Sequence, residues 1–193
     1  DPQSGLIVVI SKNKGLFTYD PLNKVGRQEI SWFKPELSYA QNLVYFPPNG
    51  KMYHILNDGQ VYEVTPDRSN FANSTIVQIT GITGTPPPLT IPSTSETETG
   101  FAYDSANQII GGAIVNSTFY AFDPLAKTWT SRAMQLNANG TNVTSVGKLS
   151  FHAIDYDPVN NVFIFITDHV DGAVALGVKY TWAYKYGGSA SSP

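Results

Sequence analysis

The chain has 193 residues, of which 41% are hydrophobic and 12% aromatic, a composition typical of a folded protein and not of a disordered one. Its 12 basic and 15 acidic residues leave a net charge of −3, so no basic stripe exists for a nucleic acid, and no such partner is expected. The longest apolar runs, at residues 6–10 and 162–166, have only the length of strands, so we expect no membrane insertion.

One turn signature recurs at a fixed spacing. Residues 19 positions apart mark each of three successive segments, and a fourth segment opens with the same signature at Asp157-Pro158. The three pairs are Asp1 with Asp20, Pro47 with Pro66, and Asp104 with Asp123. A spacing that persists while its surroundings change indicates a repeated supersecondary unit. The sequence therefore predicts an all-β fold of β-propeller blades, each with four antiparallel strands.

The first unit, residues 1–36, is predicted to be a partial blade. Alternating apolar residues after a turn at residues 1–5 indicate three strands. These strands are residues 6–10, 16–20 and 27–30. Because the innermost strand is missing, the apolar run of residues 6–10 is left at a sheet edge. We expect another polypeptide to complete or cover that edge.

Two complete blades follow, at residues 37–82 and 99–136. The second unit contains Asn57-Asp58-Gly59, a strong hairpin signal because Asn and Gly tolerate positive φ. Its predicted strands are residues 39–46, 51–56, 60–65 and 75–80. Those of the third unit are residues 100–103, 108–114, 118–122 and 128–134.

The fourth unit, residues 148–186, is predicted to be a second partial blade, followed by a flexible tail at residues 187–193. Its strands are residues 150–156, 161–167 and 180–186. An insertion of about ten residues, 168–177, lengthens its middle hairpin. The total is about three and a half blades, below the usual number for a closed ring. The chain is expected to belong to a larger or multi-chain propeller; the alternative is a compact four-bladed ring with trimmed terminal blades.

The third unit resembles the repeats of kelch-type propellers. Its segment Phe122-Asp123-Pro124 followed by Thr128-Trp129 is similar to the Tyr-Asp-Pro and Thr-Trp turn of that family. Tyr19-Asp20-Pro21 and the doublet Gly111-Gly112 add to the resemblance. It implies a fold more than a function, because kelch propellers include intracellular adaptors and the catalytic domain of copper radical oxidases. Those oxidases need a cysteine-crosslinked tyrosine, this chain has no cysteine, and no cofactor is expected.

Each turn aspartate is predicted to cap its own turn by accepting a backbone N–H two residues further on, while the following proline presets φ. The alternative is an array of carboxylates with a chemical role.

Five residues are candidates for ligand binding. His152, on an innermost strand, can line a central channel as a ligand or base, or be a hydrogen-bonded core histidine. Asp168, His169 and Asp171 have the oxygen-rich character of a weak calcium or sugar contact, although calcium usually takes six or more oxygen ligands. A solvated loop is the alternative for them. Trp182 can stack on a sugar ring or pack in the core. No metal site is predicted.

The long connections, residues 82–99, 135–147 and 168–179, are all expected on one side of the blades, which makes that side the default functional face. Glycosylation sequons occur at Asn73, Asn116, Asn139 and Asn142. The last three lie on this same face, where glycans would hinder a large partner. Either these sites are unmodified or the partner binds elsewhere.

The sequence favours a non-catalytic propeller module for recognition or assembly, in an extracellular or cell-surface glycoprotein. Its expected partners are the polypeptide that covers the propeller edge, and glycans. One alternative is the C-terminal part of a secreted carbohydrate-active hydrolase or lyase whose catalytic residues lie mostly elsewhere. Another is a structural subunit of an extracellular or viral filament.

Overall fold

The protein consists of antiparallel β-sheets. The structure is a computed structural model, and it describes residues 1–11, 15–30, 42–56, 59–87, 100–115, 118–134, 136–138, 141–143, 152–167 and 180–187. Within these ranges every element is a strand except one turn of 3₁₀ helix, η1 (Phe71–Asn73). The predicted all-β class is confirmed. The described part contains no helix with the length and apolar character needed to cross a membrane.

Four sheets follow one another along the chain, each with its strands in sequence order. The first sheet is β1 (Ile7–Ser11), β2 (Gly15–Asp20) and β3 (Val25–Ile30). The second is β4 (Asn42–Phe46), β5 (Lys51–Ile55), β6 (Val61–Thr65) and β7 (Thr75–Gln78). The third is β8 (Ala102–Asp104), β9 (Ile109–Val115), β10 (Thr118–Asp123) and β11 (Thr128–Ala133). The fourth is β14 (His152–Asp157), β15 (Val162–Thr167) and β16 (Tyr180–Tyr184).

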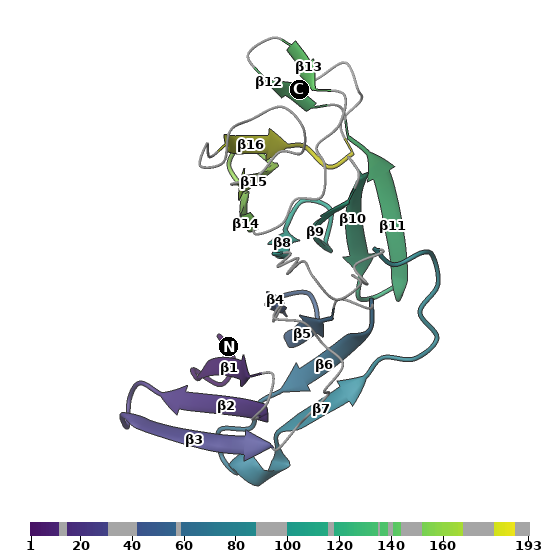
Figure 1. Cartoon of the computed structure of the whole chain (residues 1–193). Coiled ribbons are helices and arrows are strands. Elements are labelled where there is room, and N and C mark those ends of the chain that lie inside the picture. The colour runs from purple at the N-terminus through teal and green to yellow at the C-terminus, as the bar shows by residue number, and fades with distance from the viewer. Residues whose placement is uncertain are drawn as a thin grey trace.

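The sheets form a curved row. Figure 1 shows β1, β4, β8 and β14 on its concave side, and β8 lies beside both β4 and β14. The sheets of the described residues do not close into a barrel or ring. The insertion at residues 168–177 and the tail from residue 188 lie outside the described part.

A short hairpin that the sequence analysis did not predict follows the third sheet in the chain. It consists of β12 (Leu136–Ala138) and β13 (Thr141–Val143), which are paired antiparallel. The strands flank Asn139-Gly140, a dipeptide that favours two-residue hairpin turns.

The predicted capping of the turns by aspartate is confirmed. Each aspartate side chain accepts N–H groups from the residues two and three positions further on, at 2.8–3.3 Å. The aspartates are Asp1, Asp20, Asp104, Asp123 and Asp157. The fourth residue after each of them has positive φ, whether or not it is glycine. These residues are Gly5, Lys24, Gln108, Lys127 and Asn161, with φ between 53° and 69°.

Apolar clusters join each sheet to the next. Between the first and second sheets, Ile10 and Leu16 pack with Met52 and Val64. Between the second and third, Phe46 and Tyr53 pack with Phe101 and Phe122. Between the third and fourth, Phe119 packs with Phe163 and Trp182. Successive residues of a strand point to opposite faces. In the second sheet Met52 therefore contacts the first sheet and Tyr53 the third, so both faces of an inner sheet are buried.

Candidate functional site

The predicted ligand-binding residues do not come together in the described part of the protein. Asp168, His169 and Asp171 lie outside it. His152 is the first residue of β14 and pairs with Thr167 of β15. Trp182 of β16 is only 8% exposed, and its ring stacks on Phe165 at 6.4 Å between centroids. This burial supports the core-packing interpretation of Trp182 over a sugar platform.

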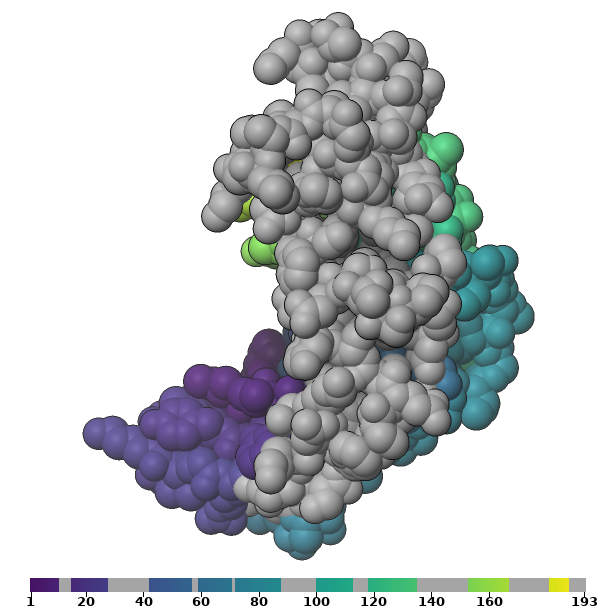
Figure 2. Space-filling view, viewed as in Figure 1, coloured from purple at the N-terminus to yellow at the C-terminus, as the bar shows by residue number. Residues whose placement is uncertain are grey.

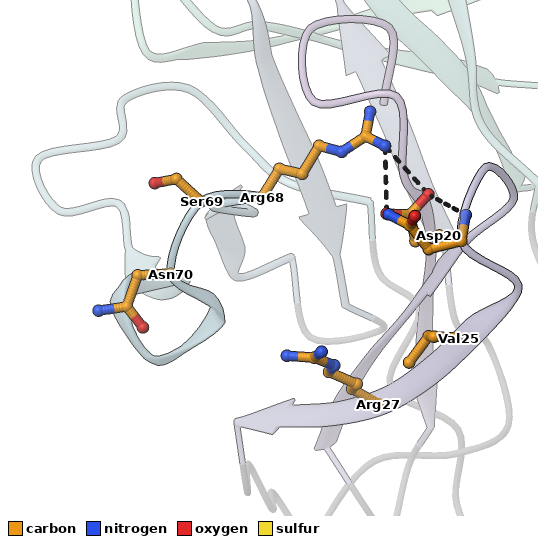
Figure 3. A pocket seen from close by; sticks show the side chains of 7 residues that line it. Asp20, Val25, Arg27, Arg68, Ser69 and Asn70 are labelled. Carbon is orange, nitrogen blue, oxygen red and sulfur yellow. Dashed lines mark hydrogen bonds and ion pairs between the residues drawn. The ribbon is translucent and has the colours of Figure 1, made fainter.

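A polar cavity lies instead between the first and second sheets, where the turn after β2 meets the loop after β6. Its volume is about 340 Å³, and Figure 3 shows its lining. The lining residues are Asp20, Asn23, Val25, Arg27, Arg68, Ser69 and Asn70. The turn and the loop each connect the third and fourth positions of the four-strand template, so the cavity is on the side opposite the one where the sequence predicts the long connections.

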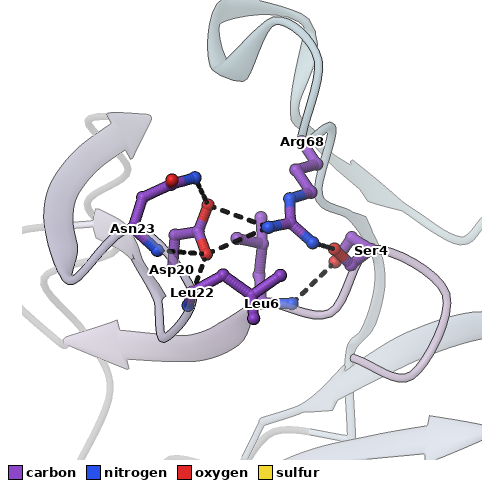
Figure 4. A network of polar contacts seen from close by, with 6 residues as sticks. All are labelled: Ser4, Leu6, Asp20, Leu22, Asn23 and Arg68. Carbon is purple, nitrogen blue, oxygen red and sulfur yellow. Dashed lines mark hydrogen bonds and ion pairs between the residues drawn. The ribbon is translucent and has the colours of Figure 1, made fainter.

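Arg68 holds this junction together. Figure 4 shows its guanidinium between two segments of the first sheet's chain. Nη2 lies 3.1 Å from both carboxylate oxygens of Asp20, and Nη1 donates to the carbonyl oxygen of Ser4 at 3.2 Å. The Asp20 side chain is only 7% exposed. Arg68 therefore fixes the loop after β6 against the N-terminal turn and the turn after β2.

The Asp20 carboxylate stays ionised in this setting. Partial desolvation raises its pKa, but the side-chain amide of Asn23, the N–H groups of Asn23 and Leu22, and the Arg68 charge outweigh that effect and lower the pKa below its ordinary value. The Asn23 amide donates to Asp20 at 2.7 Å. The carboxylate is therefore occupied by donors, among them the Arg68 guanidinium.

The loop that forms the far wall of the cavity is held in a fixed shape. Asp67 Oδ1 accepts the N–H of Ser69 at 2.8 Å, the hydroxyl of Ser69 at 2.7 Å and the N–H of Asn70 at 3.0 Å. The N–H of Asn70, the Ser69 hydroxyl and other donors lower the pKa of Asp67, despite some desolvation. This loop therefore presents Arg68 from a preorganised backbone.

Arg27 supplies the second positive charge. It projects from β3 beneath the Arg68–Asp20 pair, as Figure 3 shows, and its residue is exposed. Arginine guanidinium groups bind carboxylates through paired N–H donors in a planar geometry. The lining thus combines two guanidinium groups with one aspartate and with amide and hydroxyl groups.

Arg68 also borders a second hollow of about 370 Å³ on its other side. The lining there includes the carboxylates of Asp1 and Asp67, which repel anions, and the sequon residue Asn73, the last residue of η1. Asn142 lies in β13, while Asn116 and Asn139 fall outside the described residues.

The sequence analysis missed the two arginines. The only local signal was a charged residue, Arg68, in a connection directly after the turn signature at Pro66. The cavity itself depends on Asp20 and Arg68, which are 48 positions apart, so no local pattern reveals it.

No three His, Asp or Glu side chains of the described ranges converge as a metal ion would require. The chain matches no model of a known protein family, and no curated protein is significantly similar to it.

Proposed function

We propose that this chain is a non-catalytic recognition module of an extracellular or cell-surface protein. It is built from propeller blades and binds an acidic segment of a protein partner in the cavity beside Arg27 and Arg68. The observation that carries the proposal is a cavity lined by two arginines, in which Asp20 and Ser4 hold the Arg68 guanidinium in a fixed position.

The sheet arrangement supports the propeller. The four sheets share one turn geometry. Within each sheet the strands follow in chain order from the concave side outward, and apolar clusters are buried between neighbouring sheets. The kelch-like segments of the sequence point in the same direction. A rigid scaffold that displays connecting loops is the usual support for a binding site.

The lining favours a peptide carboxylate over a sugar. None of the seven described lining residues is aromatic, so the cavity offers no ring for a pyranose to stack on. Arg68 is already fixed by Asp20 and Ser4, so little side-chain entropy is lost when a carboxylate binds. The whole chain has a net charge of −3, so its overall charge would not attract an acidic peptide.

The test is titration with a short oligoglutamate peptide, followed by calorimetry and by amide shifts in NMR spectra. Arg27→Ala should weaken binding roughly tenfold, because a charge-assisted hydrogen bond contributes about 1.5 kcal/mol. Arg132→Ala is the matched control: Arg132 belongs to the third sheet, where its guanidinium lies 4.6 Å from the ring centre of Tyr186, away from the cavity. Binding should be unchanged in this control.

Two outcomes would contradict the proposal. One is an equal loss of affinity in both variants, which would indicate nonspecific attraction of the peptide. The other is binding of an oligogalacturonate, and not of the peptide, with shifts at the cavity, which would reassign the site to acidic glycans.

A further inference from the structure

The first sheet exposes an apolar face. In β1, Ile7 and Val9 are 53% and 51% exposed, although Leu6 and Ile10 beside them are buried. Ile7 is paired with Tyr19 of β2, whose side chain is also exposed. We call this the rear face of the first sheet, made of Ile7, Val9 and Tyr19. Figure 2 shows the first sheet projecting at one end of the molecule.

The fourth sheet exposes an apolar face at the other end of the row. Ile164 and Ile166 of β15 are 37% and 46% exposed, whereas Phe163 and Phe165, which alternate with them, are fully buried. We call the exposed side the front face of the fourth sheet, made of Ile164 and Ile166. Figure 1 shows the first and fourth sheets at opposite ends of the curved row.

The rear faces of the other three sheets are buried. Ile7 lies two positions after the positive-φ residue Gly5, and the residues at that position in the later sheets are Met52, Ile110 and Phe163. All three are buried, and each packs against the preceding sheet. The shared template therefore marks the rear face of the first sheet as a surface that another sheet covers.

Front faces show the same regularity. Ile164 lies three positions after the positive-φ residue Asn161, and its counterparts are Val8, Tyr53 and Gly111. Val8 and Tyr53 pack against the following sheet. A β-carbon on Gly111 would lie 2.8 Å from the Phe163 ring of the following sheet. A front face of one sheet and a rear face of the next thus meet at all three junctions of this molecule.

We propose that the front face of the fourth sheet binds the rear face of the first sheet in a second copy of this chain. The inference rests on the propeller arrangement proposed above. A second copy is the occupant because each copy carries both halves of the junction that the template forms three times already. The contact is heterologous: it gives a closed dimer if the rotation closes after two copies, and a longer head-to-tail assembly if it does not.

The test uses sedimentation and light scattering of the full chain over a wide range of concentration. The wild type should exceed the 21.0 kDa of one copy, with a mass that rises with concentration. Ile7→Lys and Ile166→Lys each place a charge in the junction and should each reduce the association constant at least about tenfold. The control is Leu125→Lys, since Leu125 is equally exposed but lies in the turn after β10, and its association should equal that of the wild type.

Mixing the two variants separates this pairing from others. The intact front face of the Ile7→Lys copy can bind the intact rear face of the Ile166→Lys copy, so an equimolar mixture should associate through one junction. A monomeric wild type, a single variant that associates like the wild type, or a mixture that remains monomeric would overturn the proposal. Circular dichroism confirms that each variant is folded.

Peptide binding at the proposed recognition site is measured separately. Oligoglutamate binding is measured on the Ile7→Lys variant, in which the cavity beside Arg27 is unchanged. Loss of association with retained peptide binding leaves the proposed function standing, whereas association without peptide binding refutes only the recognition site.

Discussion

His54 is the residue that links this fold to pH. Its side chain is fully buried in β5, and its Nδ1 lies 2.7 Å from the carbonyl oxygen of Asn42. Burial lowers the pKa of His54 to about 4, although the hydrogen bond to Asn42 opposes the shift. The imidazole is therefore neutral in the folded protein at pH 7, with its Nδ1 proton donated to Asn42.

Acid should destabilise the protein through His54 before the carboxylates titrate. The unfolded chain takes up this proton near pH 6.5 and the folded protein only near pH 4, so the free energy of unfolding falls between these two values. The loss is about 1.4 kcal/mol per pH unit, or roughly 3 kcal/mol in all. Urea unfolding from pH 7 to 4 measures it. His54→Gln should remove this part of the slope, and an unchanged slope would show that His54 is not responsible.

The positive-φ residue of each turn carries backbone strain where it has a side chain. Lys127 has φ 53°, a conformation that costs a residue with a β-carbon about 1 kcal/mol or more. Lys127→Gly should therefore stabilise the protein by about 0.5–1 kcal/mol in urea unfolding, after the entropic cost of glycine. Asn161→Gly is the comparison, and its gain should be smaller, because asparagine tolerates this region and its Oδ1 also accepts a hydrogen bond from the Tyr156 hydroxyl. A stabilisation by Asn161→Gly that equals or exceeds that by Lys127→Gly would contradict the strain argument.

Among the elements, β9 shows why the glycine doublet stands where it does. A β-carbon on Gly112 would lie 2.2 Å from the carbonyl oxygen of Gly100 and 2.8 Å from Cα of Phe101. Both neighbours are backbone atoms, which cannot rotate away. Gly112 therefore permits the close approach of the chain that leads into β8.

Gly112→Ala should destabilise the protein by at least about 2 kcal/mol, because the backbone must shift to relieve the clash. The matched control is Gly26→Ala in β3, where the nearest atom to the new carbon is Tyr19 Cδ2 at 3.9 Å and φ is not positive. Its effect should stay within about 0.5 kcal/mol. Thermal and urea unfolding of both variants test the difference, and equal effects would contradict it.

The strands could be predicted well because their signals are local. The expected range 128–134 appears as β11, and 75–80 appears as β7, each ending one or two residues earlier. The segment that covers the outer edge of the third sheet could not be predicted. Thr83 forms backbone hydrogen bonds with Lys127 and Trp129 and covers the β11 edge, a contact between segments far apart in the sequence.

At the scale of the whole molecule, the exposed faces are the main consequence of the repeat. Inner sheets bury both faces, while the first sheet exposes Ile7 and Val9 and the fourth exposes Ile164 and Ile166. Apolar side chains this exposed favour association, and the head-to-tail contact proposed above is the arrangement that the other junctions repeat. The proposed recognition site at Arg68 lies at the junction of the first and second sheets, so the proposed assembly and the proposed binding use different surfaces of the first sheet.

The sequence by itself determined most of the strands and the capped turns, because period-two alternation and Asp-Pro turns act between residues close together in the chain. Only the tertiary structure decided which faces are covered, that Trp182 is buried, and that Arg68 meets Asp20 from another sheet. The physical reason is that burial and ion pairing depend on which surfaces meet in space, and an alternating pattern specifies a face without specifying its partner.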